Sequence, residues 1–398
     1  MRHISLTIIA ATLTLLVACS PRHSGNGSNE KLTADIDSLF TPMFDGSGPG
    51  AIVLIAKGDS VIYERGFGKA RLDDTYAPID SSTLFNICSI SKQFSSAALL
   101  LLQELGTLSL DDTVSGFFPE FHSPLLRQIT LRQMMSHTSG IPDTRPRTET
   151  QWKQYLKKHK SVYANVDDYK HYALWEESTR YLDDLDSLAF TPGTRYEYQN
   201  PTFQLVLPIV ERVSGREFTA WMRENIFAPA GMSNTVYLEP DVPMNNYAHG
   251  YIPTEGDDST AFRSRDGRWE ESDYGEASFF PTKADGGLYT TSRDFLRWQR
   301  ALYAGRIISK ESLADATAPI ILTDEADTYY GLGLFSYRHE GFPLKIFHTG
   351  DNGGFYTYAA YFPDSEVSVI VFANRPDWDR PATIAAVDSI LAADKVIQ

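Results

Sequence analysis

The sequence predicts an α+β fold in which strands from both ends of the chain form one central antiparallel sheet flanked by helices. Three observations lead to this prediction. Two short strand patterns lie near the N-terminus, four lie in the last third of the chain, and the segment between them has mostly helical patterns. Helices bury the faces of such a sheet. We therefore expect an α/β sandwich with a sheet part at about residues 32–85 and 281–398, and an inserted, mostly helical part at about residues 86–280.

The N-terminal strand patterns follow a helix and a sharp break. Residues 31–40 place Leu32, Ile36, Leu39 and Phe40 on one helical stripe. After the Gly- and Pro-containing break DGSGPG, the segments AIVLIA and VIYERG are joined at KGDS, which has the composition of a hairpin turn. This part of the chain is expected to form one helix and one β-hairpin.

The C-terminal part contains four strand candidates separated by turn residues. They are YGLGLFSY, LKIFHTG, FYTYAAYF and VSVIVFAN, and the segment PDSE before the last of them has turn composition. Residues 381–393 then place Ile384, Val387 and Leu391 on one helical face. Two polar stretches, 143–190 and 253–278, are predicted to form helix and loop that lie over the surface. We expect them to line the cleft that holds the functional site.

The chain begins with MRHISLTIIAATLTLLVACS, which has the pattern of a secretory signal peptide covering residues 1–18. A basic start precedes an apolar run that is too short for a stable membrane span. The ending resembles a bacterial lipobox, which implies cleavage before Cys19 and attachment of lipid to its sulfur. A plain signal peptide that contains a cysteine is the alternative. Residues 19–31 are polar and rich in Gly and Ser, as expected for a flexible tether that precedes a domain at residues 32–398.

Composition excludes several classes of protein. The formal net charge of −15 and the lack of a Lys/Arg run argue against nucleic-acid binding. The same acidity argues against electrostatic binding to anionic lipid, so membrane attachment is expected to depend on the lipid at Cys19. Cys88 is the other cysteine, which rules out a disulfide scaffold and a cysteine-rich metal site. We expect a monomer in the bacterial cell envelope, at the periplasmic or outer-membrane face, that needs no metal or cofactor.

The segment ICSISKQF, residues 87–94, places Ser89 and Lys92 three positions apart at the start of a very apolar helix. A helix N-terminus offers unpaired N–H groups and positive dipole charge, and positions i and i+3 share one face. To act as a neutral base at pH 7, a lysine needs its pKa lowered by about three units, which burial can provide. The alternative is a helix cap beside a snorkelling lysine. The same spacing at Ser28 and Lys31, in the polar tail, shows that the pair alone is a weak signal.

Two downstream segments strengthen the catalytic interpretation. In TPGTRYEYQNPTF, residues 191–203, Tyr198 and Asn200 precede Pro201 and another apolar helix. A helix cap is the alternative function of Asn200. In KIFHTGDNGGFYTYAAYFP, residues 345–363, a strand ends in His-Thr-Gly, where glycine permits close approach of the backbone. A glycine-rich hairpin with an incidental histidine is the alternative there.

These three segments, in this order, resemble the serine β-lactamase and penicillin-binding protein superfamily, and most closely its class C β-lactamase and DD-peptidase-like branch. The resemblance extends from about residue 48 to residue 375. It implies the serine β-lactamase/DD-peptidase-like fold. Further segments that match this branch are GFGKA, ITLRQMMSHTSGIPD, FAPAGMSNT and DGGLYTTSRDFLRW.

The resemblance implies that Ser89 is the acylated nucleophile and that Lys92 and Tyr198 share the proton transfers. Which of these two accepts the serine proton stays open at this point. Asn200 would hydrogen-bond the substrate amide or Lys92. His137, in SHTSG, is expected to belong to a turn and helix cap near the site rather than to act as a base, and the DGG at residues 285–287 is expected to be a tight backbone feature.

The third segment would bind the substrate along one strand. The resemblance implies that His348, Thr349 and Gly350 lie alongside the substrate like an added strand, and that the N–H groups of Ser89 and Asp351 form the oxyanion hole.

Three residues are harder to interpret. Class C β-lactamases usually have lysine at the position of His348, and a half-ionised histidine would hold a substrate carboxylate less well as pH rises. Arg375 is a candidate for a fixed charge nearby. Pro208 is expected to kink the helix behind Tyr198.

The sequence therefore supports an envelope serine hydrolase that cleaves amide or ester bonds through an acyl-enzyme. Peptides that contain D-amino acids, or peptidoglycan fragments, are the expected substrates. An esterase or a weak β-lactamase of the same family is the first alternative. A non-catalytic protein that binds muropeptides or β-lactams is the alternative of another class, and the intact Ser89, Lys92, Tyr198 and Asn200 argue against it.

Overall fold

The computed structural model describes residues 26–44, 46–73, 75–143, 149–158, 161, 179–238, 244–254, 267–272 and 283–398. The expected signal peptide, Cys19 and most of the two polar stretches at 143–190 and 253–278 lie outside these residues. In the part of the chain that is described, no helix is both long and apolar enough to cross a membrane.

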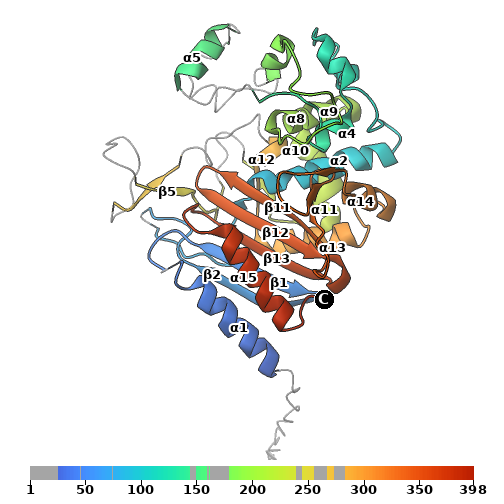
Figure 1. The fold of residues 1–398 in the computed structure, drawn as a ribbon. Coiled ribbons are helices and arrows are strands. Elements are labelled where there is room, and N and C mark those ends of the chain that lie inside the picture. Colours follow the sequence, from blue (N-terminus) through green and yellow to red (C-terminus); the bar gives the residue numbers. More distant parts are fainter. Residues whose placement is uncertain are drawn as a thin grey trace, which may run out of the picture.

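The central element is an eight-stranded antiparallel sheet with the order β2-β1-β13-β12-β11-β10-β9-β8 (Figure 1). The N-terminal hairpin β1-β2 pairs with the last strand, β13, and Val53 of β1 lies opposite Val371 of β13. Both ends of the chain therefore build one sheet, which confirms the predicted fold class. The strands are β1 (Ala51–Lys57), β2 (Ser60–Phe67), β8 (Ile321–Leu322), β9 (Thr328–Tyr330), β10 (Phe335–Tyr337), β11 (Lys345–Asn352), β12 (Phe355–Phe362) and β13 (Val367–Ala373).

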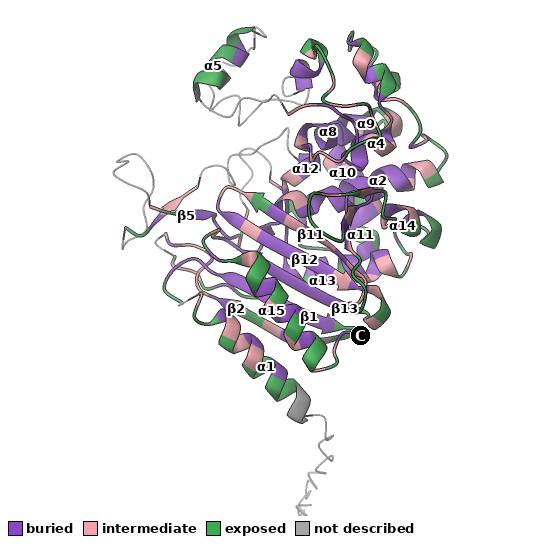
Figure 2. Ribbon diagram, viewed as in Figure 1, coloured by how far each residue is buried: buried purple, intermediate pink, exposed green. Residues whose placement is uncertain are grey.

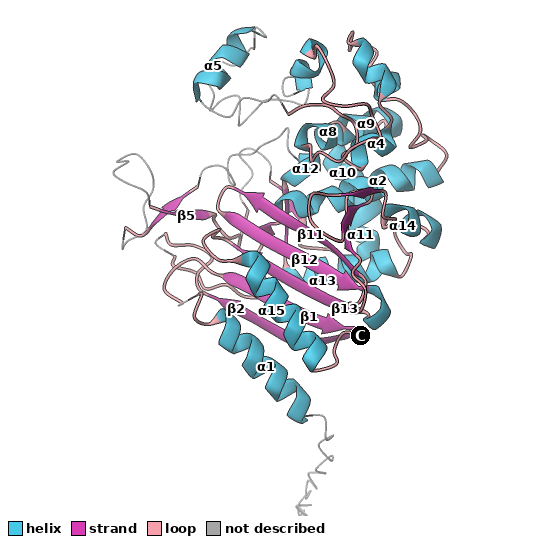
Figure 3. Cartoon of the chain, in the orientation of Figure 1, coloured by secondary structure: helices cyan, strands magenta, loops and turns pink. Residues whose placement is uncertain are grey.

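Helices cover both faces of the sheet, as Figure 3 shows. On one face, α1 (Asn26–Phe40) and α15 (Arg380–Ala393) lie in contact and bury one side of β1 and β13. On the other face, α13 (Ser292–Tyr303) packs against the same strands, with Phe295 against Phe372. The central strands are buried on both sides (Figure 2), which explains why their sequences are nearly continuous apolar runs.

The helical region lies beyond β11 and contains α2 (Lys92–Glu104), which is buried along most of its length. It also holds a small sheet with the order β3-β7-β4, and a separate pair β5-β6. Its elements include η1 (Cys88–Ser91), α3 (Val114–Phe117), α4 (Leu131–Met135), α5 (Glu149–Lys158), α8 (Asn200–Gln204), α9 (Val206–Ser214), α10 (Phe218–Met222), α11 (Ala228–Ala230), α12 (Lys283–Gly286), α14 (Lys310–Ala316), β3 (Phe85–Asn86), β4 (Val236–Tyr237), β5 (Tyr251–Pro253), β6 (Trp269–Glu271) and β7 (Leu288–Thr290).

Two local expectations are refined by the structure. The segment YGLGLFSY is not one strand, because Gly331 donates its N–H to Leu334 at 2.8 Å and closes a turn between β9 and β10. Gly333 in this turn has a φ of +76° and lies against α2, where a Cβ would come within 2.9 Å of the Lys92 carbonyl oxygen. The helix after Tyr198 is interrupted at Leu205, between α8 and α9, as expected from Pro208, which cannot donate a backbone hydrogen bond.

Candidate active site

Ser89 lies in the single turn η1 that leads into α2, close to the sheet strand β11. The turn is fixed from outside by the Asn86 side chain, which accepts the N–H of Cys88 at 2.7 Å, and by Thr357 of β12, which donates to the Ile87 carbonyl at 3.1 Å. Cys88 has a φ of +52°, a conformation that non-glycine residues rarely adopt. The fold therefore holds the Ser89 backbone in a strained turn at the start of a buried helix.

Lys92 is fully buried beneath this turn, and its Nζ donates to the Ser89 Oγ at 3.0 Å. The backbone carbonyl of Asp285 in α12 accepts a second hydrogen bond from Nζ at 2.7 Å. The amine also lies 5.0 Å from the ring centre of Tyr198 and 5.6 Å from that of Phe203. The amine is thus held within direct reach of the candidate nucleophile, as the i, i+3 spacing predicts.

Tyr198 completes the group around Ser89. Burial raises the pKa of its phenol well above the usual range, and the nearby Ser89 hydroxyl opposes only part of that rise. Among the described residues no partner satisfies the Tyr198 hydroxyl, so the approach to Ser89 is close without being a formed hydrogen bond. The phenol stays protonated in this environment and has a free proton to donate.

His137 fixes the position of Tyr198 rather than acting on substrate. Its Nδ1 accepts the N–H of Gln199 at 3.0 Å, and its ring lies 4.2 Å from the Tyr198 ring, centre to centre. Burial, with Lys92 and His348 nearby, lowers the pKa of His137 well below its usual value. These contacts support the predicted structural function, although no pattern in the sequence indicates that His137 touches the Tyr198 segment.

Asn200 is the first residue of α8, but it does not cap the helix. Gln199 occupies the capping position, and no side chain makes a capping hydrogen bond there. The Asn200 Oδ1 is buried and has no partner among the described residues, Lys92 included. An unpaired buried acceptor two residues from Tyr198 is available to accept a hydrogen bond from a substrate N–H.

His348 points to the Ser89 side of β11 and is buried. Its Nδ1 must donate to the Thr349 carbonyl at 2.6 Å, since a carbonyl only accepts, and its Nε2 then accepts from the Tyr330 hydroxyl at 3.1 Å. Burial is the main cause that lowers the pKa of His348 to about 3, and the nearby Lys92 acts in the same direction. The expectation of a half-ionised histidine is therefore wrong: His348 is neutral at pH 7, and both ring nitrogens are engaged.

Arg375 does not supply a substitute charge. Its guanidinium is paired with Asp377 and lies 4.4 Å from the centre of the Trp269 ring. Its side chain is therefore already engaged, and these contacts do not involve the residues around His348.

Gly350 permits β11 to lie directly against the Ser89 turn. A Cβ at this position would come within 2.4 Å of the Ile87 carbonyl oxygen and 2.2 Å of the Thr357 Oγ1. We expect Gly350→Ala to push β11 away from Ser89, to lower the free energy of unfolding by about 1–3 kcal/mol and to reduce turnover more than tenfold. Urea unfolding and steady-state kinetics measure the two effects.

Gly116→Ala in α3 is the matched control for this substitution. The nearest atom to its new Cβ is the Thr113 Oγ1 at 3.9 Å, which is an ordinary contact distance. This variant should keep wild-type activity and stability. Equal behaviour of the two variants would contradict the close approach at Gly350.

Thr349 and Asp351 have side chains on the other face of β11. Strand pairing places Thr349 opposite Tyr358, which belongs to the core beneath α15, whereas Gly350 faces Thr357 on the Ser89 side. The Asp351 carboxylate lies 3.2 Å from Arg380. Binding of substrate by Thr349, and an oxyanion hole formed by the N–H groups of Ser89 and Asp351, stay predictions.

Among the described residues, the β10 side of β11 has no partner strand beyond Phe347. The pairing of β11 with β10 ends at Phe347, while its pairing with β12 continues to Asn352. A peptide could add to the unpaired edge beyond Phe347, which is the arrangement that the sequence predicts for substrate.

The functions of two site residues were not identified from the sequence. Asp285 supplies the carbonyl that holds Lys92, although DGG was read only as a tight backbone feature, and Tyr330 donates to His348. Neither could be identified from spacing, because Asp285 lies 193 positions from Lys92 and acts through its backbone.

Comparison with known proteins identifies the family of this chain. The sequence matches the Beta-lactamase family over residues 36–393. It is 26% identical over 346 residues to penicillin-binding protein 4* of Bacillus subtilis, covering 86% of this chain and 72% of that protein. It is 25% identical over 391 residues to the D-alanyl-D-alanine-carboxypeptidase/endopeptidase AmpH of Escherichia coli, covering 93% and 90%.

A D-aminopeptidase of Gluconobacter oxydans is 26% identical over 329 residues, which cover 82% of this chain but only 56% of that longer relative. The crystal structure of a penicillin-binding protein from Bacillus halodurans superposes with a TM-score of 0.69 at 25% identity, over 91% of this chain and 99% of that one. From the family match and from Ser89, Lys92 and Tyr198 gathered at one helix start, we conclude that the chain belongs to the β-lactamase family and is a DD-peptidase-like serine hydrolase.

Proposed function

We propose that this protein hydrolyses peptides containing D-amino acids, or peptidoglycan fragments, through an acyl-enzyme on Ser89. The observation that carries the proposal is the buried Lys92 amine, 3.0 Å from the Ser89 hydroxyl. The names of its relatives support the substrate class, since they include a D-alanyl-D-alanine carboxypeptidase and D-aminopeptidases.

The geometry favours Lys92 over Tyr198 as the group that takes the serine proton. Ser89 Oγ attacks the substrate carbonyl carbon while its proton passes to Lys92 Nζ, and the tetrahedral intermediate then expels an amine or alcohol. Tyr198, whose phenol burial keeps protonated, is placed to donate a proton to that leaving group. Lys92 returns the serine proton to Tyr198. Water then attacks the ester carbonyl and gives a proton to Lys92, which passes it to Ser89 as the acyl–oxygen bond breaks and the acid product leaves.

A neutral His348 affects which substrate end can be recognised. A charged histidine would hold a terminal carboxylate, but both nitrogens of His348 are already bonded inside the protein. This favours substrates that are held by hydrogen bonds to the edge of β11 beyond Phe347 and to Asn200. An amide or ester of a D-amino acid fits such a site as well as a peptide that ends in a carboxylate.

Mass spectrometry of the intact protein after brief incubation with a substrate panel tests the proposal. The panel contains D-alanyl-D-alanine peptides, D-amino acid amides, short-chain p-nitrophenyl esters and nitrocefin. We expect an acyl adduct at Ser89 and turnover of at least one D-amino acid substrate. Turnover of esters alone would establish the esterase alternative, and fast nitrocefin hydrolysis the β-lactamase alternative. Tight muropeptide binding without an adduct would mean a non-catalytic binding protein.

The charge state of His348 gives a pH prediction. The folded pKa is about 3 and the unfolded value is 6.5. Between these values an unfolded chain binds a proton at this imidazole and the folded protein does not. Stability should therefore fall with falling pH below 6.5, by about 1.4 kcal/mol per pH unit once the unfolded imidazole is protonated. His348→Gln should flatten this dependence in urea unfolding measured from pH 4 to pH 8.

Imidazole NMR signals provide the direct check of this pH prediction. The His348 resonance should not titrate between pH 5 and pH 8, because burial keeps the ring neutral over that range. A His348 resonance that titrates near pH 6.5 would contradict the buried neutral state.

The proposal extends to localisation. The N-terminal segment supports secretion and lipidation at Cys19, followed by a tether that keeps the hydrolase in the cell envelope. This tether is shorter than the expected residues 19–31, because α1 begins at Asn26. Metabolic labelling with a palmitate analogue, compared between wild type and Cys19→Ser, tests it. Label that persists in Cys19→Ser, or label absent from the wild type, would exclude this anchor.

A further inference from the structure

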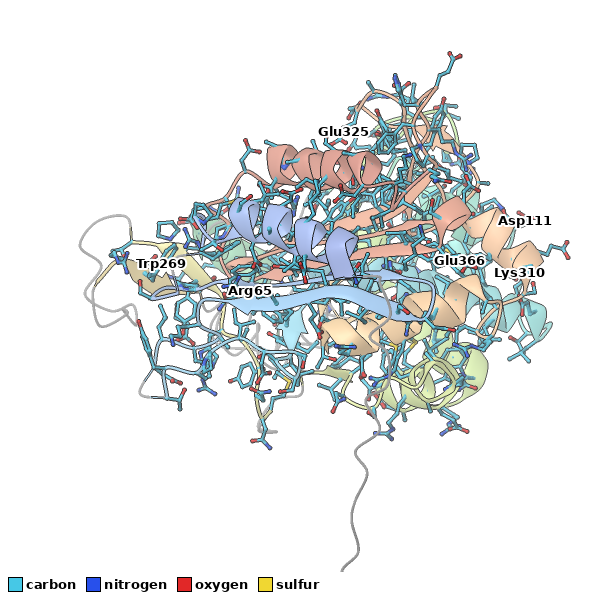
Figure 4. All side chains as sticks on the ribbon, turned by 90° about the horizontal axis from the view of Figure 1, so that it is seen from below. Arg65, Asp111, Trp269, Lys310, Glu325 and Glu366 are labelled. Carbon is cyan, nitrogen blue, oxygen red and sulfur yellow. The ribbon has the colours of Figure 1, made fainter. Side chains whose placement is uncertain are left out.

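The face of the sheet opposite Ser89 carries a groove that the proposed hydrolysis does not use. We call it the α15 groove: a hollow of about 590 Å³ between α15 and the strands β9 to β12. Among its lining residues are Phe335, Tyr337, Lys345, Phe347, Tyr358 and Asp388. Figure 4 labels Glu325, which lies at the rim of the groove beside α15.

The groove and the active site share one strand. Along β11, His348 and Gly350 face Ser89, whereas Lys345, Phe347 and Thr349 face the groove, because successive residues of a strand point to opposite sides. Cross-strand pairing is consistent with this, since Tyr337 faces Lys345 and Tyr358 faces Thr349. The groove therefore lies on the other face of β11 from Ser89, and Phe335 in its wall also contacts the His348 ring at 5.0 Å, centre to centre.

Two polar atoms in the groove wall are buried without a partner among the described residues. They are the Tyr358 hydroxyl and the Asp388 Oδ1. The two residues are 3% and 6% exposed, respectively. Leaving such groups unpaired costs about 1–3 kcal/mol each, so native proteins usually satisfy them with a ligand, a water or a neighbour. These atoms therefore point to a polar occupant of the groove.

Three of the four charged side chains that line the groove are held in ion pairs, and Glu325 at the rim is the fourth. Lys345 Nζ lies 2.7 Å from the other oxygen of Asp388, and Arg380 pairs with Asp351 at 3.2 Å. The Lys345 amine also lies 5.3–5.6 Å from the ring centres of Tyr337, Phe342 and Phe347. An ionic ligand of either sign would have to compete with these pairs, which favours a neutral one.

The remaining wall is aromatic and only partly buried. Phe335 and Phe347 are stacked with 5.2 Å between ring centres, and both are partly exposed. A purely polar ligand would leave these rings in water, and a hydrocarbon chain would leave the two polar atoms unpaired. The groove therefore matches a neutral molecule that has an apolar face and several hydroxyl groups.

We propose that the α15 groove binds a saccharide of one or two pyranose rings. A hydroxyl group both donates and accepts, so sugar hydroxyls satisfy the acceptor Asp388 Oδ1 and the phenol of Tyr358. The C–H face of the ring packs on the exposed parts of Phe335 and Phe347. The volume of the hollow lies within the range of about 300–1,000 Å³ that small-molecule sites have.

Ligand-detected NMR and calorimetry with Ser89→Ala protein test this proposal without any dependence on hydrolysis. The probes are glucose, maltose, N-acetylglucosamine and its β-1,4-linked dimer, with benzamide and octanol as the arylamide and hydrocarbon comparisons. We expect saturable binding of at least one saccharide. We expect no saturable binding of benzamide or of octanol. The Tyr358→Phe variant should bind that saccharide about tenfold more weakly.

The stability of the variants separates ligand binding from a structural function. The Tyr358→Phe variant should be at least as stable as its parent without ligand, because the buried hydroxyl that it loses has no partner among the described residues. Tyr361→Phe is the matched control, since it lies on the same strand and packs against Tyr303 outside the groove. It should bind saccharide like its parent. Phe347→Ala provides a second groove variant and should also lose binding.

Three results would overturn the proposal. One is the absence of saturable binding by every saccharide. Another is saccharide binding that Tyr358→Phe and Phe347→Ala leave unchanged, which would place the sugar elsewhere, for example in the catalytic cleft. The third is tighter binding of benzamide or octanol than of any saccharide, which would identify an apolar site.

Discussion

Replacing Ser89 with alanine is expected to abolish turnover, by a factor on the order of 10⁴–10⁶, while the fold stays intact. The hydroxyl is the atom that becomes acylated, and the residual rate would come from binding alone. Alanine preserves the turn, because the Cys88 N–H and the Ile87 carbonyl hold it through their own hydrogen bonds. The variant should unfold at the wild-type urea concentration within experimental error.

The matched control for Ser89→Ala is Ser28→Ala. Ser28 has the same three-residue spacing to Lys31 that Ser89 has to Lys92, but Lys31 is exposed and paired with Asp35 and Asp394. The control should keep full activity and still form the acyl adduct seen by mass spectrometry. An adduct that survives in Ser89→Ala would remove the basis of the proposed mechanism.

Replacing Lys92 should have the second largest effect, and two substitutions separate its two contributions. Lys92→Ala removes the amine and empties a fully buried position, so we expect activity to fall by about 10²–10⁴ and stability by about 2–3 kcal/mol. Lys92→Met removes the amine but keeps most of the side-chain volume. It should lose as much activity as Lys92→Ala while losing less stability.

Steady-state kinetics and urea unfolding of the two Lys92 variants provide the measurement. In both, the Asp285 carbonyl loses a donor, so part of the destabilisation should be common to them. Lys31→Ala should behave like wild type in both assays. Near-normal turnover in Lys92→Met would mean that the amine is not the proton acceptor, and Tyr198 would then be the group to test.

Much of the fold could be predicted from the sequence because its signals are local. The hairpin at KGDS, the apolar runs of β1 and β13 and the turn at PDSE each follow from a few neighbouring residues. Their combination into one sheet also followed, since short strands at both ends of a chain have few other partners. The splitting of YGLGLFSY was missed, because the turn there depends on contacts of Gly331 and Gly333 with α2 and the Ala316 region.

The sequence predicted the contacts of some site residues but not the protonation or hydrogen bonding of others. Ser89 and Lys92 share a helical face, so their contact follows from spacing, and the structure confirms it at 3.0 Å. The state of His348 did not follow, because its pKa depends on burial and on Tyr330, whose position relative to β11 is set by packing. The same holds for the free amide oxygen of Asn200, which the sequence could assign equally well to a helix cap.

By itself, the sequence determined the order of the elements, the family and the pair of side chains that start the chemistry, since these depend on short-range geometry and on motif spacing. Only the tertiary structure decided the protonation states and the hydrogen-bond partners of the site residues. It buries Tyr198 and His348, brings the Asp285 carbonyl to Lys92 and leaves a second groove behind the catalytic strand. The physical reason is that protonation and hydrogen-bond pairing depend on solvent exposure and on partners from distant parts of the chain, and packing of the folded chain fixes both.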